Sequence, residues 1–315
     1  MKKWTTAEMP KDLSNKLYVI TGTSSGIGTV LAYELAKRGA QVIAANRNVE
    51  KAKKAISNIQ NENDDLSSLR ILKLDVSSLN SVREFANRIQ EDESINQIDG
   101  LLLNAGIMAL PARKVSVDGL EMQMATNVLG HHLLTSLLLP KIILANQSVV
   151  LSTSSSASSV PKDPKLWDDL NAEKKYDPWE VYGVSKMAAI HFRDGLRKIL
   201  KKGGLGNKIK VVSTHPGLTA TPLFDDSAGI FGKVFRMLKG LLMMTPEQGA
   251  LSSLRALLDS TMDDGSFIGP KGLMGFSGYP KQVDVYNPKL SLDPKLQEKM
   301  WNYCNETTGA NWKLN

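Results

Sequence analysis

Short apolar runs alternate with longer segments of helical periodicity from residue 17 onward, and this alternation constrains the fold more than any other feature. Short runs of this kind fit strands buried on both faces, and the segments between them fit helices that cover a parallel sheet. We therefore predict an α/β fold, with one doubly wound parallel sheet and helices on both faces. The predicted strands are residues 17–20, 41–45, 71–76, 100–103, 148–152 and 208–213.

Apolar side chains also recur at helical spacing between these runs. The clearest stripes lie in residues 27–35, 79–89 and 133–139, and the last of them is predicted to end before Pro140. Two later helices are predicted where a capping side chain precedes a proline, at Thr245 and at Asp293.

Composition narrows the class of protein further. Hydrophobic residues make up 42% of the 315 residues and charged residues 23%, which is ordinary globular usage. A single cysteine, Cys304, excludes an internal disulfide, and the four histidines have no metal-ligand spacing, so no metal site is predicted. No repeat or linker interrupts the chain. We predict an N-terminal arm, residues 1–16, followed by one domain, residues 17–315.

The formal charge of +7 raises the question of an anionic partner. Residues 193–210 alone hold seven basic side chains and one acid, so we predict a solvated helix face and no nucleic-acid partner. No apolar stretch approaches the roughly 20 residues needed to span a bilayer. The N-terminus lacks the apolar segment of a signal peptide. These observations predict a cytoplasmic protein without a transmembrane segment.

Three glycines stand between the first predicted strand and the helical stripe that follows it, spaced Gly-x-x-x-Gly-x-Gly. Glycine lets the backbone approach a ligand closely, and the free N–H groups at a helix N-terminus favour a phosphate. The same pattern also suits a plain strand-to-helix turn, but its position favours a nucleotide cofactor in a Rossmann fold. The predicted contacts are Gly22, Ser24, Ser25, Gly26, Ile27 and Gly28.

The end of the second predicted strand reads Asn46-Arg47. Enzymes that use NAD place an acid at this point to hold the ribose 2′-hydroxyl. An amide followed by a guanidinium would instead accept a 2′-phosphate, whereas an acid would repel it. We therefore predict that NADP(H) is preferred over NAD(H), although an exposed loop arginine without function would look the same.

Tyr182 and Lys186 are four residues apart in a segment predicted to be helical through Leu200. This spacing places both side chains on one face of the helix. A phenol titrates near pH 10, and a neighbouring ammonium would lower its pKa and make it a usable acid or base. Tyr-x-x-x-Lys alone occurs by chance in many helices; its combination with the glycine loop makes it informative.

With these motifs in order, the chain resembles a short-chain dehydrogenase/reductase from about residue 15 to the C-terminus. The glycine loop and the Tyr-x-x-x-Lys pair match the family in spacing. The further motifs that match are Asp75-Val76, Asn104-Ala105-Gly106, Asn127, a serine after the fifth strand, and Pro216-Gly217-x-x-x-Thr221. The pattern places the serine best at Ser155, with Ser154 as a one-residue alternative.

The resemblance implies a role for each matching position. Tyr182 would protonate the carbonyl oxygen during reduction, Ser155 would hydrogen-bond that oxygen, and Lys186 would bind the nicotinamide ribose. Asn127 would hold a water of a proton relay. Pro216, Gly217, Thr219 and Thr221 would seat the nicotinamide carboxamide. The hydride would come from the cofactor, so the protein would supply placement and electrostatics.

Finer features resemble the retinol dehydrogenase-like and WW-domain oxidoreductase-like branch. They include Trp4, the Tyr176-Asp177-Pro178-Trp179 segment and Gly278-Tyr279-Pro280. The branch commonly prefers NADP(H) and acts on lipophilic aldehydes, ketones and alcohols. An apolar, Met-rich and basic segment at about residues 223–244 is predicted to be a lid over such a substrate. A peripheral contact with a membrane or a second subunit would suit the same segment.

The leading prediction is an NADP(H)-dependent oxidoreductase that interconverts a small to medium apolar carbonyl and its alcohol. A catalytically idle nucleotide-binding regulator is the alternative from another class, and a reductase of a conjugated double bond is a second enzyme alternative. Oligomerisation through the helices that carry Asn127 and Tyr182 is common in the family. The sequence leaves monomer and homodimer open.

Overall fold

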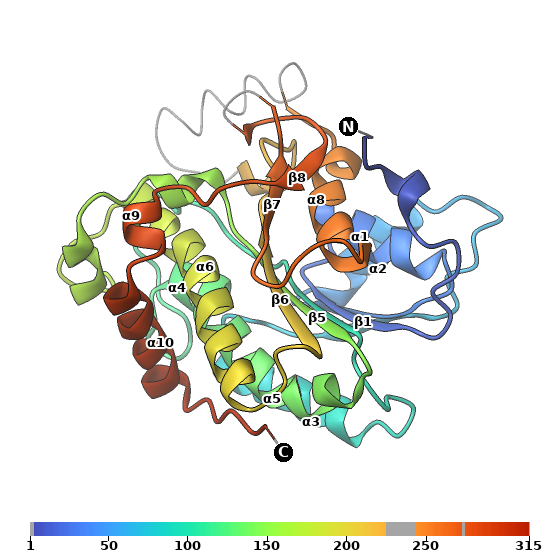
Figure 1. Cartoon of the computed structure of the whole chain (residues 1–315), viewed down its shortest axis with the longest axis horizontal. Coiled ribbons are helices and arrows are strands. Elements are labelled where there is room, and N and C mark those ends of the chain that lie inside the picture. Colours follow the sequence, from blue (N-terminus) through green and yellow to red (C-terminus); the bar gives the residue numbers. More distant parts are fainter. Residues whose placement is uncertain (1–2, 225–242, 273–274, 315) are drawn as a thin grey trace.

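One eight-stranded sheet runs through the middle of the molecule, in the order β3-β2-β1-β4-β5-β6-β7-β8 (Figure 1). The computed structural model describes residues 3–224, 243–272 and 275–314. The strands are β1 (Leu17–Thr21), β2 (Gln41–Asn46), β3 (Leu69–Lys73), β4 (Gly100–Leu103), β5 (Ser148–Thr153), β6 (Ile209–Thr214), β7 (Phe267–Pro270) and β8 (Pro280–Gln282). Strands β1 to β7 pair in parallel, and β8 is antiparallel to β7. The predicted doubly wound fold is confirmed.

Two parts of the sheet differ from the sequence prediction. Strand β3 begins and ends earlier than the predicted 71–76, because after Lys73 the chain turns away while Leu74 and Val76 still bury their side chains. An apolar run therefore outlasts its strand. Strands β7 and β8 are not predicted because they are only four and three residues long and contain Gly or Pro.

The helices lie on both faces of the sheet, as predicted (Figure 1). They are α1 (Gly26–Ala36), α2 (Val49–Ser57), α3 (Leu79–Glu91), α4 (Met122–Met124), α5 (Gly130–Leu144), α6 (Pro178–Lys202), α8 (Pro246–Leu258), α9 (Pro288–Ser291) and α10 (Pro294–Thr308). Helix α5 continues through Pro140 instead of ending before it. Pro140 lacks the N–H that would bond to the carbonyl of Ser136, so α5 continues past it with one hydrogen bond fewer.

Short helical turns complete the chain. The 3-10 turns are η1 (Thr6–Glu8), η3 (Ser156–Ser159), η4 (Pro164–Asp168) and η5 (Pro222–Phe224), and η2 (Ala125–Leu129) is a π-helical turn between α4 and α5.

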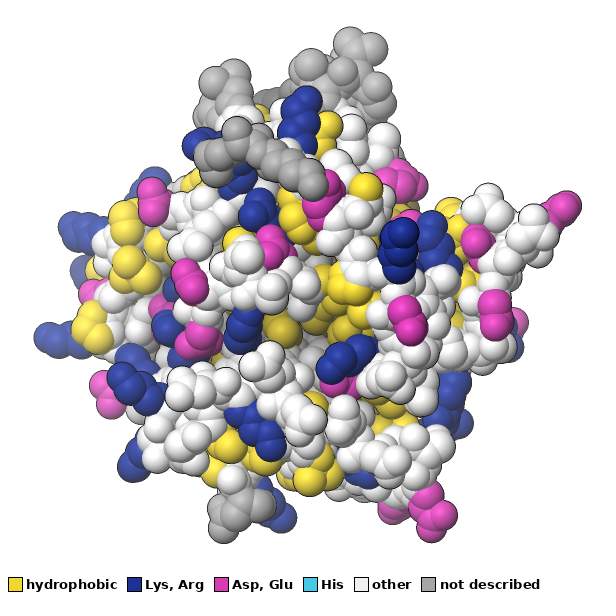
Figure 2. Space-filling model, turned by 45° about the vertical axis from the view of Figure 1, so that its right-hand side comes forward, with side chains coloured by type: hydrophobic (Ala, Val, Ile, Leu, Met, Phe, Trp, Pro, Cys, Tyr) yellow, Lys and Arg dark blue, Asp and Glu magenta, His cyan; other side chains and the backbone are white. Residues whose placement is uncertain are grey.

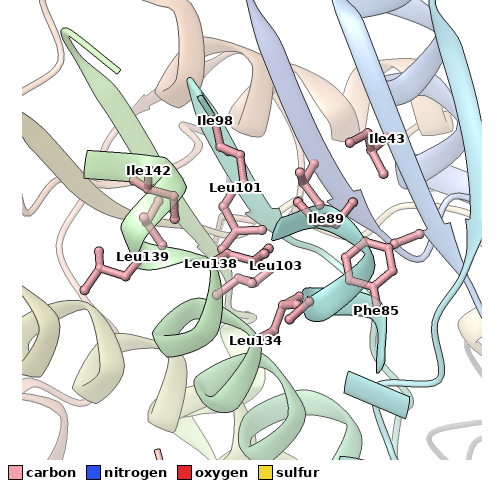
Figure 3. Close-up of a cluster of buried hydrophobic side chains, with 14 of the residues drawn as sticks. Ile43, Phe85, Ile89, Ile98, Leu101, Leu103, Leu134, Leu138, Leu139 and Ile142 are labelled. Carbon is pink, nitrogen blue, oxygen red and sulfur yellow. The ribbon is translucent and has the colours of Figure 1, made fainter. Parts of the chain in front are cut away.

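Each face of the sheet has its own hydrophobic core. On one face α3, α5 and α6 pack on the strands, and Figure 3 shows Phe85 and Ile89 of α3 meeting Leu134 and Leu138 of α5 over Leu101 of β4. On the other face α1 and α8 cover the strands. The N-terminal arm packs into this second core through three buried side chains, Trp4, Met9 and Leu13.

A third layer covers part of the first face, because α10 packs on α6 and α5. Its Trp301 stacks on Trp312 of the C-terminal tail, and both rings contact His132 of α5 edge-on. Gly195 of α6 makes this approach feasible, since a Cβ there would lie 2.3 Å from the Trp301 ring. The faces of α5 and α6 that point away from the sheet are therefore largely buried under α10 and the C-terminal tail.

Two expectations about the surface need correction. Arg193 in the basic segment is only 5% exposed and pairs with Asp194 at 2.7 Å, and Arg197 pairs with Asp264 at 2.6 Å. The segment is therefore not simply a solvated face. On the face drawn in Figure 2, Lys and Arg side chains are interspersed with Asp and Glu.

The prediction that no apolar stretch approaches membrane-spanning length is also wrong, when length and composition are the only criteria. Among the described residues, Met122–Leu144 is long and apolar enough, and 67% of its most apolar window is buried inside the protein. Here this stretch comprises α4, η2 and α5, which pack against α3, α6 and the sheet.

Candidate active site

The carboxyl ends of the parallel strands converge on one edge of the sheet, where the strand order reverses between β1 and β4. In open α/β sheets, ligands bind in the crevice at this switch point. The ends of β1 to β6, with the segments that follow them, carry all but three of the predicted site residues. Asn127 comes from η2, and Tyr182 and Lys186 come from α6.

The glycine loop adopts a conformation that other residues would not fit. Gly22 and Gly26 have φ of +73° and +58°, and a Cβ on Gly22 would lie 2.7 Å from Ala105 Cα. A Cβ on Gly28 would lie 2.0 Å from the Gly22 carbonyl oxygen. Ser25 precedes α1 without a side-chain cap, so the first N–H groups of α1 are left for another acceptor. Ser24 in the loop and Ile27 in the first turn of α1 are both partly exposed. The loop therefore fits the phosphates of a dinucleotide.

Asn46 and Arg47 separate at the end of β2. The Asn46 carboxamide is 2% exposed; it accepts from Thr23 N at 2.7 Å and donates to Thr23 Oγ1 at 2.7 Å. Asn46 thus holds the glycine loop from inside, and its predicted contact with a 2′-phosphate does not match this burial. Arg47 is exposed and stays the predicted 2′-phosphate contact.

The motifs after β3 and β4 also brace this edge. The Asn104 amide donates to the carbonyls of Thr21 and Gly22, each at 2.9 Å. Asp75 accepts hydrogen bonds from the backbone and hydroxyl of Ser77 at 3.0 Å and 2.6 Å, beside the buried Val76. Gly106 leaves room for neighbouring polar groups, as a Cβ there would lie 3.3 Å from Lys186 Nζ.

The two candidate serines after β5 point in different directions. The Ser154 hydroxyl is 1% exposed and donates to the carbonyl of Lys186 at 2.7 Å, so it is used in packing β5 on α6. The Ser155 hydroxyl hydrogen-bonds the phenol of Tyr182 and also accepts from Ala157 N at 3.1 Å. The geometry therefore favours Ser155 as the partner of Tyr182.

Tyr182 and Lys186 lie on one face of α6, with Lys186 Nζ 5.8 Å from the Tyr182 ring centre. Burial raises the pKa of Tyr182 to about 12, and its hydrogen bond to Ser155 opposes this rise. Burial lowers the pKa of Lys186 to about 8. Lys186 Nζ donates to the Thr153 carbonyl at 3.1 Å. The expectation that Lys186 depresses the pKa of Tyr182 is therefore not met here, because desolvation dominates both groups.

Asn127 lies in the π-helical turn η2, a type of irregularity that is frequent at functional sites. Its Oδ1 accepts from Ile107 N at 2.9 Å, and its Nδ2 donates to the Ile107 carbonyl at 3.0 Å and to Ser185 Oγ at 2.9 Å. The side chain thus joins the loop after β4 to α6. Because these bonds occupy the side-chain amide, the predicted water of the proton relay would have to hydrogen-bond to the backbone carbonyl of Asn127.

The loop after β6 closes the site. Gly217 has φ of +70°, and the Thr219 hydroxyl donates to the Pro216 carbonyl at 2.9 Å. Thr221 approaches the glycine loop, since a Cβ on Gly26 would lie 2.8 Å from Thr221 Cγ2. The cofactor loop and the predicted nicotinamide loop are therefore in contact.

Tyr182 is surrounded by an apolar wall, and this wall was not predicted from the sequence. It consists of Met108, Ala109, Ala157, Trp179, Leu218, Leu223 and Met243. The Trp179 ring meets the Tyr182 ring edge-on at 6.1 Å. Apart from Trp179 in the first turn of α6, these side chains come from segments far from Tyr182 in sequence, so no local pattern marks them. Of the predicted lid, residues 225–242 lie outside the described part of the chain.

Sequence reasoning also missed His131, which lies beside the site in α5. Its Nε2 is 2.9 Å from Thr21 Oγ1, and its Nδ1 is 3.3 Å from the backbone carbonyl of Asn127. The available signal was a histidine in a mostly apolar helix, one turn after the predicted Asn127.

A glycine loop that opens a helix at the switch point, facing a Ser–Tyr–Lys group, defines a dinucleotide-dependent oxidoreductase. Comparison with known proteins gives the family. The family model of the short chain dehydrogenases matches residues 16–165. Human retinol dehydrogenase 12 is 32% identical over 96% of this chain and 89% of its own. Human polyprenol dehydrogenase is 30% identical over 94% of this chain and 86% of its own.

Solved structures agree with these relatives. An uncharacterized protein of Mycobacterium paratuberculosis superimposes with a TM-score of 0.78, at 30% identity over 99% of this chain and 100% of its own. A 3-ketoacyl-(acyl-carrier-protein) reductase of Brucella melitensis in complex with NADH has a TM-score of 0.60, at 22% identity over 81% of this chain and 96% of its own. The latter shows the fold alone.

The chain belongs to the short-chain dehydrogenase/reductase family, in its retinol dehydrogenase-like branch. Members are oxidoreductases that use nicotinamide cofactors and act on alcohols or carbonyl groups. The family identified from the sequence motifs is thereby confirmed.

Proposed function

We propose that the protein reduces an apolar aldehyde or ketone to the alcohol with NADPH, and catalyses the reverse oxidation when the cofactor ratio favours it. The observation that carries this proposal is the position of Tyr182. It hydrogen-bonds Ser155 on one side and packs in an apolar wall on the other. A carbonyl oxygen there would meet two hydroxyl donors, while the rest of the substrate would meet apolar side chains.

Each residue then has a definite task. The bound dihydronicotinamide would supply the hydride that reaches the carbonyl carbon. Tyr182 donates its proton to the carbonyl oxygen, and Ser155 hydrogen-bonds the same oxygen as negative charge develops on it. The phenol of Tyr182 is protonated at neutral pH, as a proton donor must be, although its raised pKa makes it a weaker acid than a free phenol. The buried Lys186 would then return a proton to the tyrosinate.

The preference for NADP(H) rests on the exposed guanidinium of Arg47 and on the absence of an acid at the end of β2. An exposed arginine can form charge-assisted hydrogen bonds with a 2′-phosphate.

A cytoplasmic location, without nucleic-acid partners, is part of this proposal, and peripheral membrane contact through residues 223–244 stays a prediction. So does a homodimer through the helices that carry Asn127 and Tyr182. In the described chain α10 packs on that face, so a symmetric contact there would include α10 or displace it. Sedimentation velocity of the purified protein measures the oligomeric state directly.

The test follows NADPH oxidation by purified protein with retinal, medium-chain aldehydes, aromatic ketones, steroids and quinones. Removing the proton donor in Tyr182→Phe should reduce kcat about 1000-fold, within the usual range for general acid catalysis. Tyr303→Phe on α10 makes the same chemical change outside the site and should keep the wild-type rate.

Three results would contradict the proposal. Turnover that survives in Tyr182→Phe would remove Tyr182 from the chemistry. Tight NADPH binding without turnover of any carbonyl would favour the idle regulator. Reduction of a conjugated double bond instead of the carbonyl, visible in the product, would favour the second enzyme alternative.

A further inference from the structure

A continuous chain of buried polar groups links the cofactor loop to the catalytic helix. It runs from Thr21 at the end of β1 to His131 of α5 (2.9 Å), and from His131 to the carbonyl of Asn127 (3.3 Å). From there the Asn127 amide donates to Ser185 (2.9 Å), whose hydroxyl donates to the backbone carbonyl of Tyr182 (2.7 Å). We call these five residues the polar chain. His131 is its only titratable member besides Tyr182.

The hydrogen bonds of Thr21 determine which nitrogen of His131 carries the proton. Thr21 Oγ1 accepts from the backbone N–H groups of Asn104 and Ala105, each at 3.0 Å, which uses both of its acceptor positions. Its own hydrogen can go to the Leu102 carbonyl at 3.4 Å or to His131 Nε2 at 2.9 Å, and the shorter contact is favoured. Nε2 is therefore an acceptor, and neutral His131 carries its proton on Nδ1, facing the Asn127 carbonyl.

The surroundings of His131 favour its neutral form. His131 is 5% exposed, and burial lowers its pKa to about 3. Lys186 of α6 also opposes its protonation, whereas the Asn127 carbonyl favours it. The polar partners from β1 and η2 are the neutral groups of Thr21 and Asn127. His131 therefore keeps one proton and one lone pair, each directed at a fixed partner, across the pH range of catalysis.

We propose that His131 is a positioning residue: its Nδ1–H fixes the backbone carbonyl of Asn127, and its Nε2 fixes Thr21 beneath the cofactor loop. The inference rests on the proposed function, since Asn127 and Tyr182 are placed in its machinery. The first link sets how Asn127 stands against α6, and so affects the chemical step. The second link sets how the ends of β1 and β4 meet, and so affects cofactor binding.

Two substitutions separate the links. The amide nitrogen of Asn can take the place of Nδ1, so His131→Asn keeps the bond to Asn127 and loses the bond to Thr21. The amide oxygen of Gln can take the place of Nε2, so His131→Gln keeps Thr21 and loses Asn127. We expect about tenfold lower kcat in His131→Gln with unchanged NADPH affinity, and about tenfold weaker NADPH binding in His131→Asn with nearly unchanged kcat.

The matched control is His132→Phe. His132 is the next residue of α5, equally buried, and it faces Trp301 and Trp312 instead of the site. Its replacement should leave both kcat and NADPH affinity unchanged. Equal losses in both His131 variants, tracking a loss of thermal stability, would show a merely structural role and overturn the proposal.

A measurement without turnover completes the test. Long-range ¹H–¹⁵N spectra of the cofactor-free protein should show His131 with a protonated Nδ1 and an unprotonated Nε2, unchanged from pH 5 to pH 9. The opposite tautomer, or titration in that range, would overturn the proposal. If no carbonyl substrate is reduced, the proposed function fails, yet the tautomer and the NADPH affinities of the two variants still decide the role of His131.

Discussion

The cofactor side and the substrate side of the site are built by different means. The cofactor side, residues 21–28 with the ends of β2 and β4, depends on backbone approaches, such as the 2.0 Å that would separate a Gly28 Cβ from the Gly22 carbonyl. The substrate side, the wall around Tyr182, depends on apolar side chains from separate segments, among them Met108, Trp179 and Leu218. Backbone constraints are local and rigid, whereas a side-chain wall can change residue by residue.

Three of the four histidines of the chain lie in the packed layers that support the substrate side from outside. His215 stacks on Phe267 and is 3.2 Å from the Tyr286 hydroxyl, His191 contacts the Leu290 carbonyl at 3.2 Å, and His132 lies under α10. Burial lowers the pKa of each of the three to about 4. All three are therefore neutral in the folded protein at pH 5 and protonated in the unfolded chain.

The largest expected effect is acid destabilisation of the fold, to which these three histidines contribute together with His131. Below pH 6.5 the unfolded chain binds more protons than the folded one, so the free energy of unfolding falls as the pH drops from 6.5 to about 4. Over that range each histidine lowers the free energy of unfolding by about 3 kcal/mol, because a shift of one pKa unit corresponds to 1.36 kcal/mol. Urea unfolding at pH 7 and pH 5 measures the loss.

His132→Phe is the variant that isolates one of these contributions. It keeps an aromatic ring between Trp301 and Trp312 and removes the titrating group, so its stability should fall less steeply with acid. If wild type and variant lost the same stability between pH 7 and pH 5, the buried histidines would not be the cause.

The next effect should come from the cofactor side. In Gly28→Ala the added Cβ would overlap the Gly22 carbonyl, so the loop must shift and NADPH binding should weaken about 100-fold. Gly206→Ala is the matched control, because its Cβ would meet only ordinary contacts at 3.5 Å or more. Titration of NADPH fluorescence gives both affinities, and circular dichroism confirms that the variants fold. Unchanged affinity in Gly28→Ala would show that the loop adapts.

The same contrast explains how much the sequence predicted. The glycine spacing, the strand before it and the stripe after it are contiguous, so the loop and its position at the sheet edge could be predicted. The Tyr182–Lys186 pair could be predicted because four residues are one helical turn. The roles of Ser155 and Asn127 rested on resemblance, and the geometry favours Ser155 over Ser154 only because their hydroxyls face different elements.

What the sequence did not show depends on distant contacts. Nothing in the sequence near Asn46 indicates that the side-chain amide of Asn46 forms hydrogen bonds with Thr23, 23 residues earlier. The wall around Tyr182 and the bond between Thr21 and His131, 110 residues apart, exist only after folding. The pKa of Tyr182 was misjudged for the same reason, since its burial depends on the whole packed site.

A smaller effect should mark Trp179 on the substrate side. Trp179→Ala removes part of the apolar wall while leaving Tyr182 and Ser155 in place, so KM for a bulky apolar carbonyl should rise about tenfold with little change in kcat. Trp179→Phe keeps an aromatic ring and should recover most of the loss. A fall in kcat at unchanged KM would mean that Trp179 orients Tyr182 instead of contacting substrate.

An effect of the same size, but sensitive to salt, belongs to Arg47, the exposed contact of the cofactor side. Arg47→Ala should weaken NADPH binding about tenfold and leave NADH binding unchanged, because only NADPH carries the 2′-phosphate. Lys51→Ala, an exposed change on the neighbouring α2, should alter neither affinity. The NADPH effect should shrink as salt rises, since the exposed charges are screened. Equal losses for both cofactors would assign Arg47 to the loop itself, and the preference for NADP(H) would then need another cause.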